Sequence, residues 1–78
     1  MSPFILEVPA HAAERLKLRK VSRSQVRRCI TRGVLVEVRT NGRKTRRLQI
    51  GRRTLEVIYL DRAGGFILVS CYWEGEFP

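Results

Sequence analysis

The sequence has no long hydrophobic segment and few of the residues that build metal or redox sites. Its longest uninterrupted apolar stretch, residues 66–69, is far shorter than the roughly 20 residues that span a bilayer, so we expect no membrane partner. One histidine and the absence of a Cys-x-x-Cys pair argue against structural zinc. The seven acidic residues are scattered, which gives no carboxylate cluster for a cation. Any chemistry should therefore need neither metal nor cofactor.

Cysteine is also scarce, with Cys29 and Cys71 alone. Two cysteines are too few for a disulfide framework. Cys29 falls at an apolar position of an expected helix, and Cys71 falls at one of an expected strand. We therefore expect two buried free thiols in a reducing compartment, the cytoplasm.

Acidic residues are outnumbered by basic ones, with 7 Asp and Glu against 16 Lys and Arg, for a formal net charge of +9. Thirteen of the 16 are arginine, which suits bidentate contacts with phosphate. Fifteen of them lie in two segments without any acid, residues 15–32 and residues 39–53. Such segregated charge indicates a nucleic acid as partner. The alternative is a solvated basic surface that meets an acidic protein or membrane headgroups.

The length of 78 residues leaves room for one small domain over residues 1–78 and excludes doubly wound and barrel folds. A helix is expected over about 9–20. A second is expected over about 23–32, introduced by a capping box of Ser22 and Gln25 and ended by Gly33 as a C-terminal cap. After Gly33 the hydrophobic period changes to two, and Asn41-Gly42 marks a hairpin. Strands are expected over about 34–40, 44–50, 54–60 and 66–73.

These elements predict an α+β fold in which two N-terminal helices pack on one face of a four-stranded antiparallel meander. Residues 4–8 are compatible with a short additional strand at the start. The first strand, over 34–40, is expected to be half-buried because its residues alternate in polarity. In the last strand the expected buried side consists of Ile67, Val69, Cys71 and Trp73.

His11, Arg15 and Arg19 recur every four residues along one side of the first expected helix. An imidazole is the one side chain here whose ordinary pKa lies near neutrality, so His11 is the candidate general base. Two guanidinium groups beside it could stabilise charge on a phosphate, as RNA cleavage requires. The alternative is a surface histidine beside two solvated arginines.

Seven cations flank the expected hairpin and form a candidate phosphate-binding ridge. Contact with about six phosphates of single-stranded RNA would give log affinity a slope of roughly −4 against log salt. The alternative role is protection of a sheet edge against aggregation. The seven are Arg39, Arg43, Lys44, Arg46, Arg47, Arg52 and Arg53.

Ser70 and Tyr72 point to the same side of the last expected strand and could bind a phosphate or stack on a base. Ordinary packing on the sheet is the alternative for both. Glu56 could share that face as an alternative base, although a cross-strand ion pair with an arginine is the more common outcome for such a residue.

One stretch reads His11-Ala-Ala-Glu-Arg15-Leu-Lys-Leu-Arg19-Lys-Val-Ser22, and the later ones read Gly51-Arg-Arg-Thr-Leu-Glu-Val-Ile-Tyr59 and Gly65-Phe-Ile-Leu-Val-Ser-Cys-Tyr72. Together, over about residues 8–73, they resemble the small bacterial domain-of-unknown-function family 4258 (DUF4258). One departure is Lys20, where that family often has glycine between its helices.

The family is similar to the RelE/ParE and BrnT toxins and to the barnase–colicin–RelE class of metal-independent ribonucleases. The resemblance therefore implies a RelE-like fold and an endoribonuclease toxin of a toxin–antitoxin pair. It implies RNA, free or on the ribosome, as substrate, and an acidic antitoxin protein as partner. Carried over by position, the catalytic residues would be His11, Arg15 and Arg19 on the helix with Ser70 and Tyr72 on the strand.

Two other functions stay open on the sequence. A basic module could bind nucleic acid without cleaving it, and a ParE-like toxin could act by contact with a protein. Loss of cleavage in a His11→Ala variant with unchanged RNA affinity would separate the ribonuclease from the simple binder.

Overall fold

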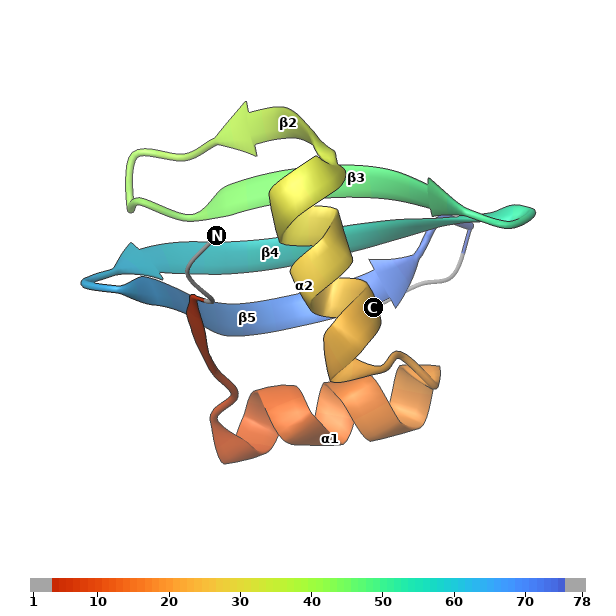
Figure 1. Ribbon diagram of the computed structural model, residues 1–78, viewed down its shortest axis with the longest axis horizontal. Coiled ribbons are helices and arrows are strands. Elements are labelled where there is room, and N and C mark those ends of the chain that lie inside the picture. Colours follow the sequence, from red (N-terminus) through yellow and green to blue (C-terminus); the bar gives the residue numbers. More distant parts are fainter. Residues whose placement is uncertain (1–3, 76–78) are drawn as a thin grey trace.

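The structure, a computed structural model, describes residues 4–75 as two helices and one five-stranded sheet (Figure 1). The strand order is β1-β5-β4-β3-β2, with β1 parallel to β5 and all other neighbours antiparallel. The expected single domain over 1–78 includes residues 1–3 and 76–78, which lie outside this description. The elements are β1 (Ile5–Glu7), α1 (Ala10–Arg19), α2 (Arg23–Arg32), β2 (Val34–Val38), β3 (Lys44–Ile50), β4 (Arg53–Arg62) and β5 (Gly65–Trp73).

The predicted four-stranded antiparallel sheet is wrong, because β1 joins the sheet as a fifth strand and pairs in parallel with β5. The pairing places Ile5 opposite Gly65. A Cβ atom at Gly65 would lie only 1.9 Å from the Ile5 carbonyl oxygen, so glycine is what allows this approach. The hydrophobic pattern of residues 4–8 is compatible with a strand but says nothing of its partner or its direction.

Both helices pack on one face of the sheet (Figure 1). α1 lies against β5, and α2 lies across β3 and β4. The opposite face of the sheet carries no helix among residues 4–75. The buried core between the two layers includes Ala12, Leu16, Val26, Cys29, Ile30, Leu55, Val57, Tyr59, Leu68, Cys71 and Trp73.

Two caps set the turn between the helices. The Ser22 N–H donates to Gln25 Oε1 at 2.9 Å and the Gln25 N–H donates to Ser22 Oγ at 3.1 Å, which confirms the capping box. α1 ends at Lys20 in the left-handed conformation (φ 56°), which glycine adopts more easily. Gly33 ends α2 in extended backbone (φ −73°). Glycine is needed there because a Cβ would lie 2.9 Å from the Arg47 carbonyl oxygen.

The alternation expected for the last strand fails at a β-bulge. β5 carries one extra residue opposite the Ile58–Tyr59 step of β4, and this insertion reverses which side chains face the helices. Leu68 is therefore buried at 1% exposure, whereas Ile67 and Val69 are only half-buried. Cys71 and Trp73, beyond the bulge, enter the core as expected.

β2 differs most from expectation, because every one of its residues is exposed. The strand lies at one end of the sheet, beyond the part that α2 covers (Figure 1). A register shift between Leu35 and Glu37 leaves Val36 in a bulge. The hairpin at Asn41-Gly42 is confirmed, with Gly42 at φ 89° and its N–H donating to the Arg39 carbonyl at 3.0 Å.

Candidate nucleic-acid interface

We call the seven cations of residues 39–53 the hairpin block. Most of them form contacts within the protein and are not available to a ligand. Arg47 donates from Nε and Nη2 to Glu56 Oε1 at 3.0 and 2.5 Å. Arg46 donates from Nε to the Tyr59 hydroxyl at 2.8 Å and from Nη1 to the Gly33 carbonyl at 2.9 Å. Both arginines therefore stabilise the sheet and its junction with α2.

Three more cations of the hairpin block have partners. Arg39 pairs with Glu37 at 3.3 Å, Lys44 pairs with Asp61, and Arg53 stacks over the Trp73 ring at 4.3 Å. The side chains of Arg43 and Arg52 have no polar partner within residues 4–75, but all of β3 separates them. Seven strand residues at about 3.3 Å each put roughly 20 Å or more between the two positions. The hairpin block is thus not one continuous ridge of available cations.

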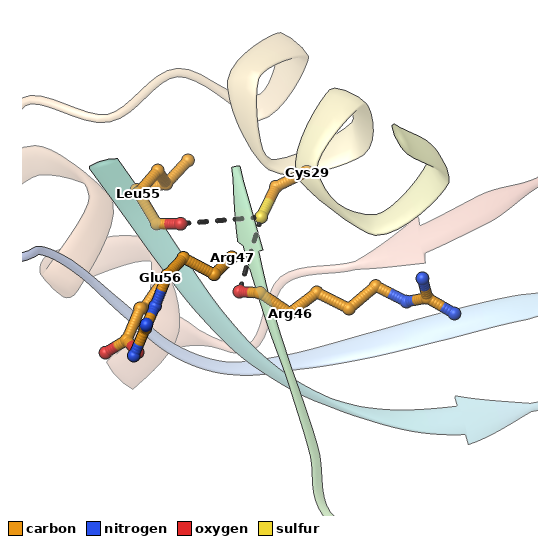
Figure 2. A network of polar contacts seen from close by, with 5 residues as sticks. All are labelled: Cys29, Arg46, Arg47, Leu55 and Glu56. Atoms are coloured by element: carbon orange, nitrogen blue, oxygen red, sulfur yellow. Dashed lines mark hydrogen bonds and ion pairs between the residues drawn. The ribbon is translucent and has the colours of Figure 1, made fainter. Parts of the chain in front are cut away.

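A row of side chains crosses β3, β4 and β5 on the face of the sheet that carries no helix, which we call the bare face. The row consists of Arg47, Glu56 and Tyr72. Figure 2 shows the side chains of Arg47 and Glu56 directed away from α2. Glu56 is only 6% exposed. Burial alone would raise the pKa of its carboxyl, but hydrogen bonds from Tyr72 and Arg47 outweigh burial and the pKa lies below its ordinary value. The expected cross-strand ion pair of Glu56 with an arginine is confirmed.

Tyr72 is committed to this row. Its hydrogen bond to Glu56, with burial as the second cause, raises the pKa of the phenol to about 12. A phenol with this pKa, already bonded to a carboxylate, is a poor proton donor at neutral pH. The pKa of Arg47 is raised in turn, chiefly by its hydrogen bond to Glu56. The three side chains of the row are therefore bonded to one another and are not available to RNA.

α1 presents His11 and Arg15 as expected, along a shallow groove of about 470 Å³. The groove is lined by His11, Glu14, Arg15, Lys17 and Leu18. Arg19 does not line it. Eight residues turn a helix by about 80° beyond two full turns, which carries Arg19 from the side of His11 to the side of the core.

Arg19 is held at the core side of α1 by its surroundings. Its carbonyl accepts a hydrogen bond from Trp73 Nε1 at 2.9 Å, and its Nη1 is buried without a hydrogen-bond partner in residues 4–75. Its guanidinium also acts on Cys71, whose pKa it lowers against the larger effect of burial. Arg19 therefore packs beneath the helix and is not available as a phosphate ligand beside His11.

Ser70 and Tyr72 lie away from the helix-borne candidates. They pair with Ile58 and Glu56 of β4, so they belong to the bare face. Cys71, between them, enters the core beneath the helices. The structure thus brings His11 and Arg15 together and brings Ser70 and Tyr72 to one face, but it separates the two pairs by the thickness of the sheet.

A second cluster of available cations lies on α2. One side of this helix is buried against the sheet and carries Val26, Cys29 and Ile30. At about 100° per residue, the opposite side has Ser24 and Thr31 at its centre. A pair of arginines four residues apart flanks that centre on each side. We call this surface the α2 arginine face; its cations are Arg23, Arg27, Arg28 and Arg32.

A groove of about 370 Å³ runs along the α2 arginine face. Arg23, Arg28 and Arg32 are exposed and form no ion pair within residues 4–75. Arg27 is fixed at the side, where Nη1 donates to the Phe4 carbonyl at 2.7 Å and the guanidinium lies 4.8 Å from the Phe4 ring. The groove is lined by Ser24, Arg27, Arg28, Thr31 and Arg32.

Charge counting along the sequence found this segment but did not select its arginines as a site. The signal was present in the spacing of Arg23 with Arg27 and of Arg28 with Arg32, on either side of Ser24 and Thr31. A helical projection of residues 23–32 would have found it.

The two cysteines are buried and free, as expected. Cys29 Sγ lies 3.4 Å from the Arg46 carbonyl and 3.7 Å from the Leu55 carbonyl, between α2 and the sheet (Figure 2). Burial raises the pKa of the Cys29 and Cys71 thiols to about 11. Neutral, inaccessible thiols of this kind are inert, so neither is a nucleophile for catalysis.

Within residues 4–75, no group of three or more His, Cys, Asp or Glu side chains could hold a metal ion. In the same part of the chain, no helix is long and apolar enough to cross a membrane. No protein-family model, curated protein or solved structure matches the chain.

Proposed function

We propose that this protein binds RNA in the cytoplasm through the α2 arginine face. The observation that carries the proposal is the contrast in available charge. Arg28 and Arg32 are exposed along one groove and Arg23 is exposed on the same helix, all without an acidic partner in residues 4–75, whereas five of the seven hairpin cations are engaged. Guanidinium groups bind phosphate oxygens in pairs, which suits a sugar-phosphate backbone lying along the groove.

The helix itself gains from such a ligand. Two pairs of like charges at a spacing of four residues each destabilise a helix by about 0.2–0.5 kcal/mol. A phosphate between the arginine rows replaces this repulsion with attraction. The Ser24 hydroxyl, exposed at the centre of the face, can donate an additional hydrogen bond.

The salt dependence of binding tests this proposal. A labelled single-stranded RNA of twelve nucleotides is titrated at several salt concentrations, beside a DNA of the same sequence. Three phosphate contacts give a slope of about −2, in place of the −4 expected for six contacts at the hairpin. Arg28→Gln should reduce the slope by about 0.7, whereas Arg52→Gln should leave it nearly unchanged. An unchanged slope in Arg28→Gln would contradict the proposal. Equal affinity for DNA would mean that the α2 arginine face binds nucleic acid in general, without a preference for RNA.

A second function, a metal-independent endoribonuclease toxin, is favoured by the groove on α1. His11 shares that groove with Arg15 and Lys17. In this function His11 accepts the proton of a 2′-hydroxyl, and the two cations stabilise the charge that develops on the phosphate. An acidic antitoxin would be its partner, as the resemblance implies. Ser70, Tyr72 and Arg19 have no part in this site.

Cleavage of total cellular RNA in EDTA, with and without ribosomes, tests the second function. His11→Ala should abolish cleavage, while Lys20→Ala, an exposed position outside the groove, should retain it. Cleavage that survives in His11→Ala would remove the assigned base. If the wild-type protein binds RNA but leaves it intact, the second function fails and RNA binding stands alone.

A further inference from the structure

β2 leaves an apolar sheet edge open to solvent. Its outer side pairs with no strand among residues 4–75, because β2 is the last strand of the sheet. Val34, Leu35, Val36 and Val38 are 68, 43, 45 and 59% exposed. These side chains lie on both faces of the strand, since Leu35 pairs with Arg46 and Val34 pairs with Arg47 of β3. A strand so apolar and so exposed is a template for pairing with another chain.

The two edges of the sheet are unequal. At the other edge, β1 has only three residues, and shortness is one way in which natural sheets limit pairing. β2 has five residues, with one acidic side chain, Glu37, and one bulge at Val36. Lysine and proline, the usual protective residues of edges, are both absent from it.

Basic side chains stand at both ends of this edge. Arg32 precedes the strand, and Arg39 and Arg43 follow it; all three are exposed. The ion pair of Arg39 with Glu37 is itself in solvent, with both side chains at least half-exposed. The whole chain carries a formal charge of +9, which repels a second copy and attracts an acidic segment.

We propose that β2 accepts an acidic, extended segment of another polypeptide as a sixth strand of the sheet. The backbone of the incoming segment pairs with the outward N–H and C=O groups of β2. Apolar side chains on its two faces cover Val34 and Val38, which lie on opposite faces of the sheet. Its carboxylates meet Arg32 at one end and Arg39 or Arg43 at the other. Arg39 lies seven positions after Arg32, so the carboxylates should stand about 23 Å apart, the length of seven extended steps.

A designed peptide provides the probe, with six valine and threonine residues, valines on both faces, between terminal aspartates seven positions apart. Binding is measured by fluorescence anisotropy, and amide hydrogen exchange is measured over residues 33–39 of the wild-type protein. We expect at least tenfold protection of the β2 amides. The same peptide with N-methyl groups on alternate backbone nitrogens should bind at least tenfold more weakly, because it lacks donors for the sheet. Terminal lysines in place of the aspartates should cost a similar factor.

The controls separate this proposal from the RNA proposal. Val36→Lys should weaken peptide binding and preserve RNA affinity, while Arg28→Gln should do the reverse. Equal binding of the N-methylated peptide, or no protection of β2 by the acidic peptide, would overturn strand addition. Protection of β2 in the protein alone, together with a dimer in sedimentation, would assign the edge to a second copy and overturn the acidic occupant. Protection of β2 by RNA would overturn it as well.

Discussion

The helical segment of residues 15–32 and the hairpin segment of residues 39–53 carry similar charge but differ in what that charge does. The helical segment has eight cations, none of which forms an ion pair within residues 4–75; two of them, Arg27 bonded to Phe4 and Arg19 packed beneath α1, are otherwise engaged. Five of the seven hairpin cations bond or stack on partners in the protein. Charge density along a sequence therefore does not measure the charge that a ligand can reach.

Secondary structure explains this difference. A residue in a strand has a neighbour about 5 Å away on the adjacent strand, and for Arg47 and Lys44 the nearby β4 supplies Glu56 and Asp61. The outer side of α2 has no adjacent element, and its own sequence contains no acid. Its arginines are thus left for something outside the chain.

Alkaline pH should have the largest effect on stability, and it acts on the core thiols while the arginines of both basic segments keep their charge. The pKa values of the Cys29 and Cys71 thiols are raised from 9.0 to about 11 in the folded protein. Their contribution is complete below pH 9 and is lost as pH rises toward 11. Two units correspond to roughly 3 kcal/mol for each thiol. Urea unfolding between pH 7 and 11 measures the loss.

The double variant Cys29→Ala, Cys71→Ala is the control for this effect. It should be less stable at pH 7 because it leaves space in the core, but its stability should fall much less steeply with pH. An equally steep fall would assign the alkaline transition to other groups, with Tyr72 the first among them, since its raised pKa acts with the same sign.

Arg47→Met should have the second largest effect on stability, and it tests the difference between the hairpin and helical segments. It leaves the buried Glu56 carboxylate with Tyr72 as its remaining donor, and this should lower the free energy of unfolding by about 1–2 kcal/mol. Arg28→Met on α2 should change stability by less than about 0.5 kcal/mol, since it removes a like-charge neighbour of Arg32. Equal destabilisation by the two substitutions in urea would show that the two segments do not differ in structural role.

Lys20→Gly should have a smaller effect than Arg47→Met, a gain of about 1 kcal/mol in stability, because Lys20 holds a left-handed backbone conformation at the end of α1. Thermal unfolding measures the gain, and RNA affinity should stay within about twofold. A loss of stability would mean that the Lys20 side chain has a structural role that outweighs its backbone conformation.

Some of this structure could be predicted because its signals are local. The capping box of Ser22 and Gln25, the hairpin at Gly42 and the apolar side of α2 each depend on residues close in sequence. The parallel pairing of β1 and the bulge of β5 could not be predicted, since both depend on contacts between distant segments.

In the candidate site, too, local features could be predicted and contacts between distant segments could not. His11 and Arg15 share a groove as their spacing indicated. Arg19 lies at the core side of the helix, because eight residues turn a helix by more than two full turns. Tyr72 was expected to face a ligand, and it instead bonds Glu56 from a neighbouring strand. Cross-strand partners of this kind cannot be read from spacing.

The most direct test compares two triple variants of equal charge. One changes Arg23, Arg28 and Arg32 to glutamine, and the other changes Arg39, Arg43 and Arg52; each lowers the formal net charge from +9 by three. Affinity for single-stranded RNA is measured at 0.1 M salt. The helical variant should lose about a hundredfold, since each phosphate contact contributes about 1 kcal/mol there, and the hairpin variant should lose less than about threefold. Equal losses would mean that RNA responds to net charge alone, and a larger loss in the hairpin variant would place the interface on the hairpin.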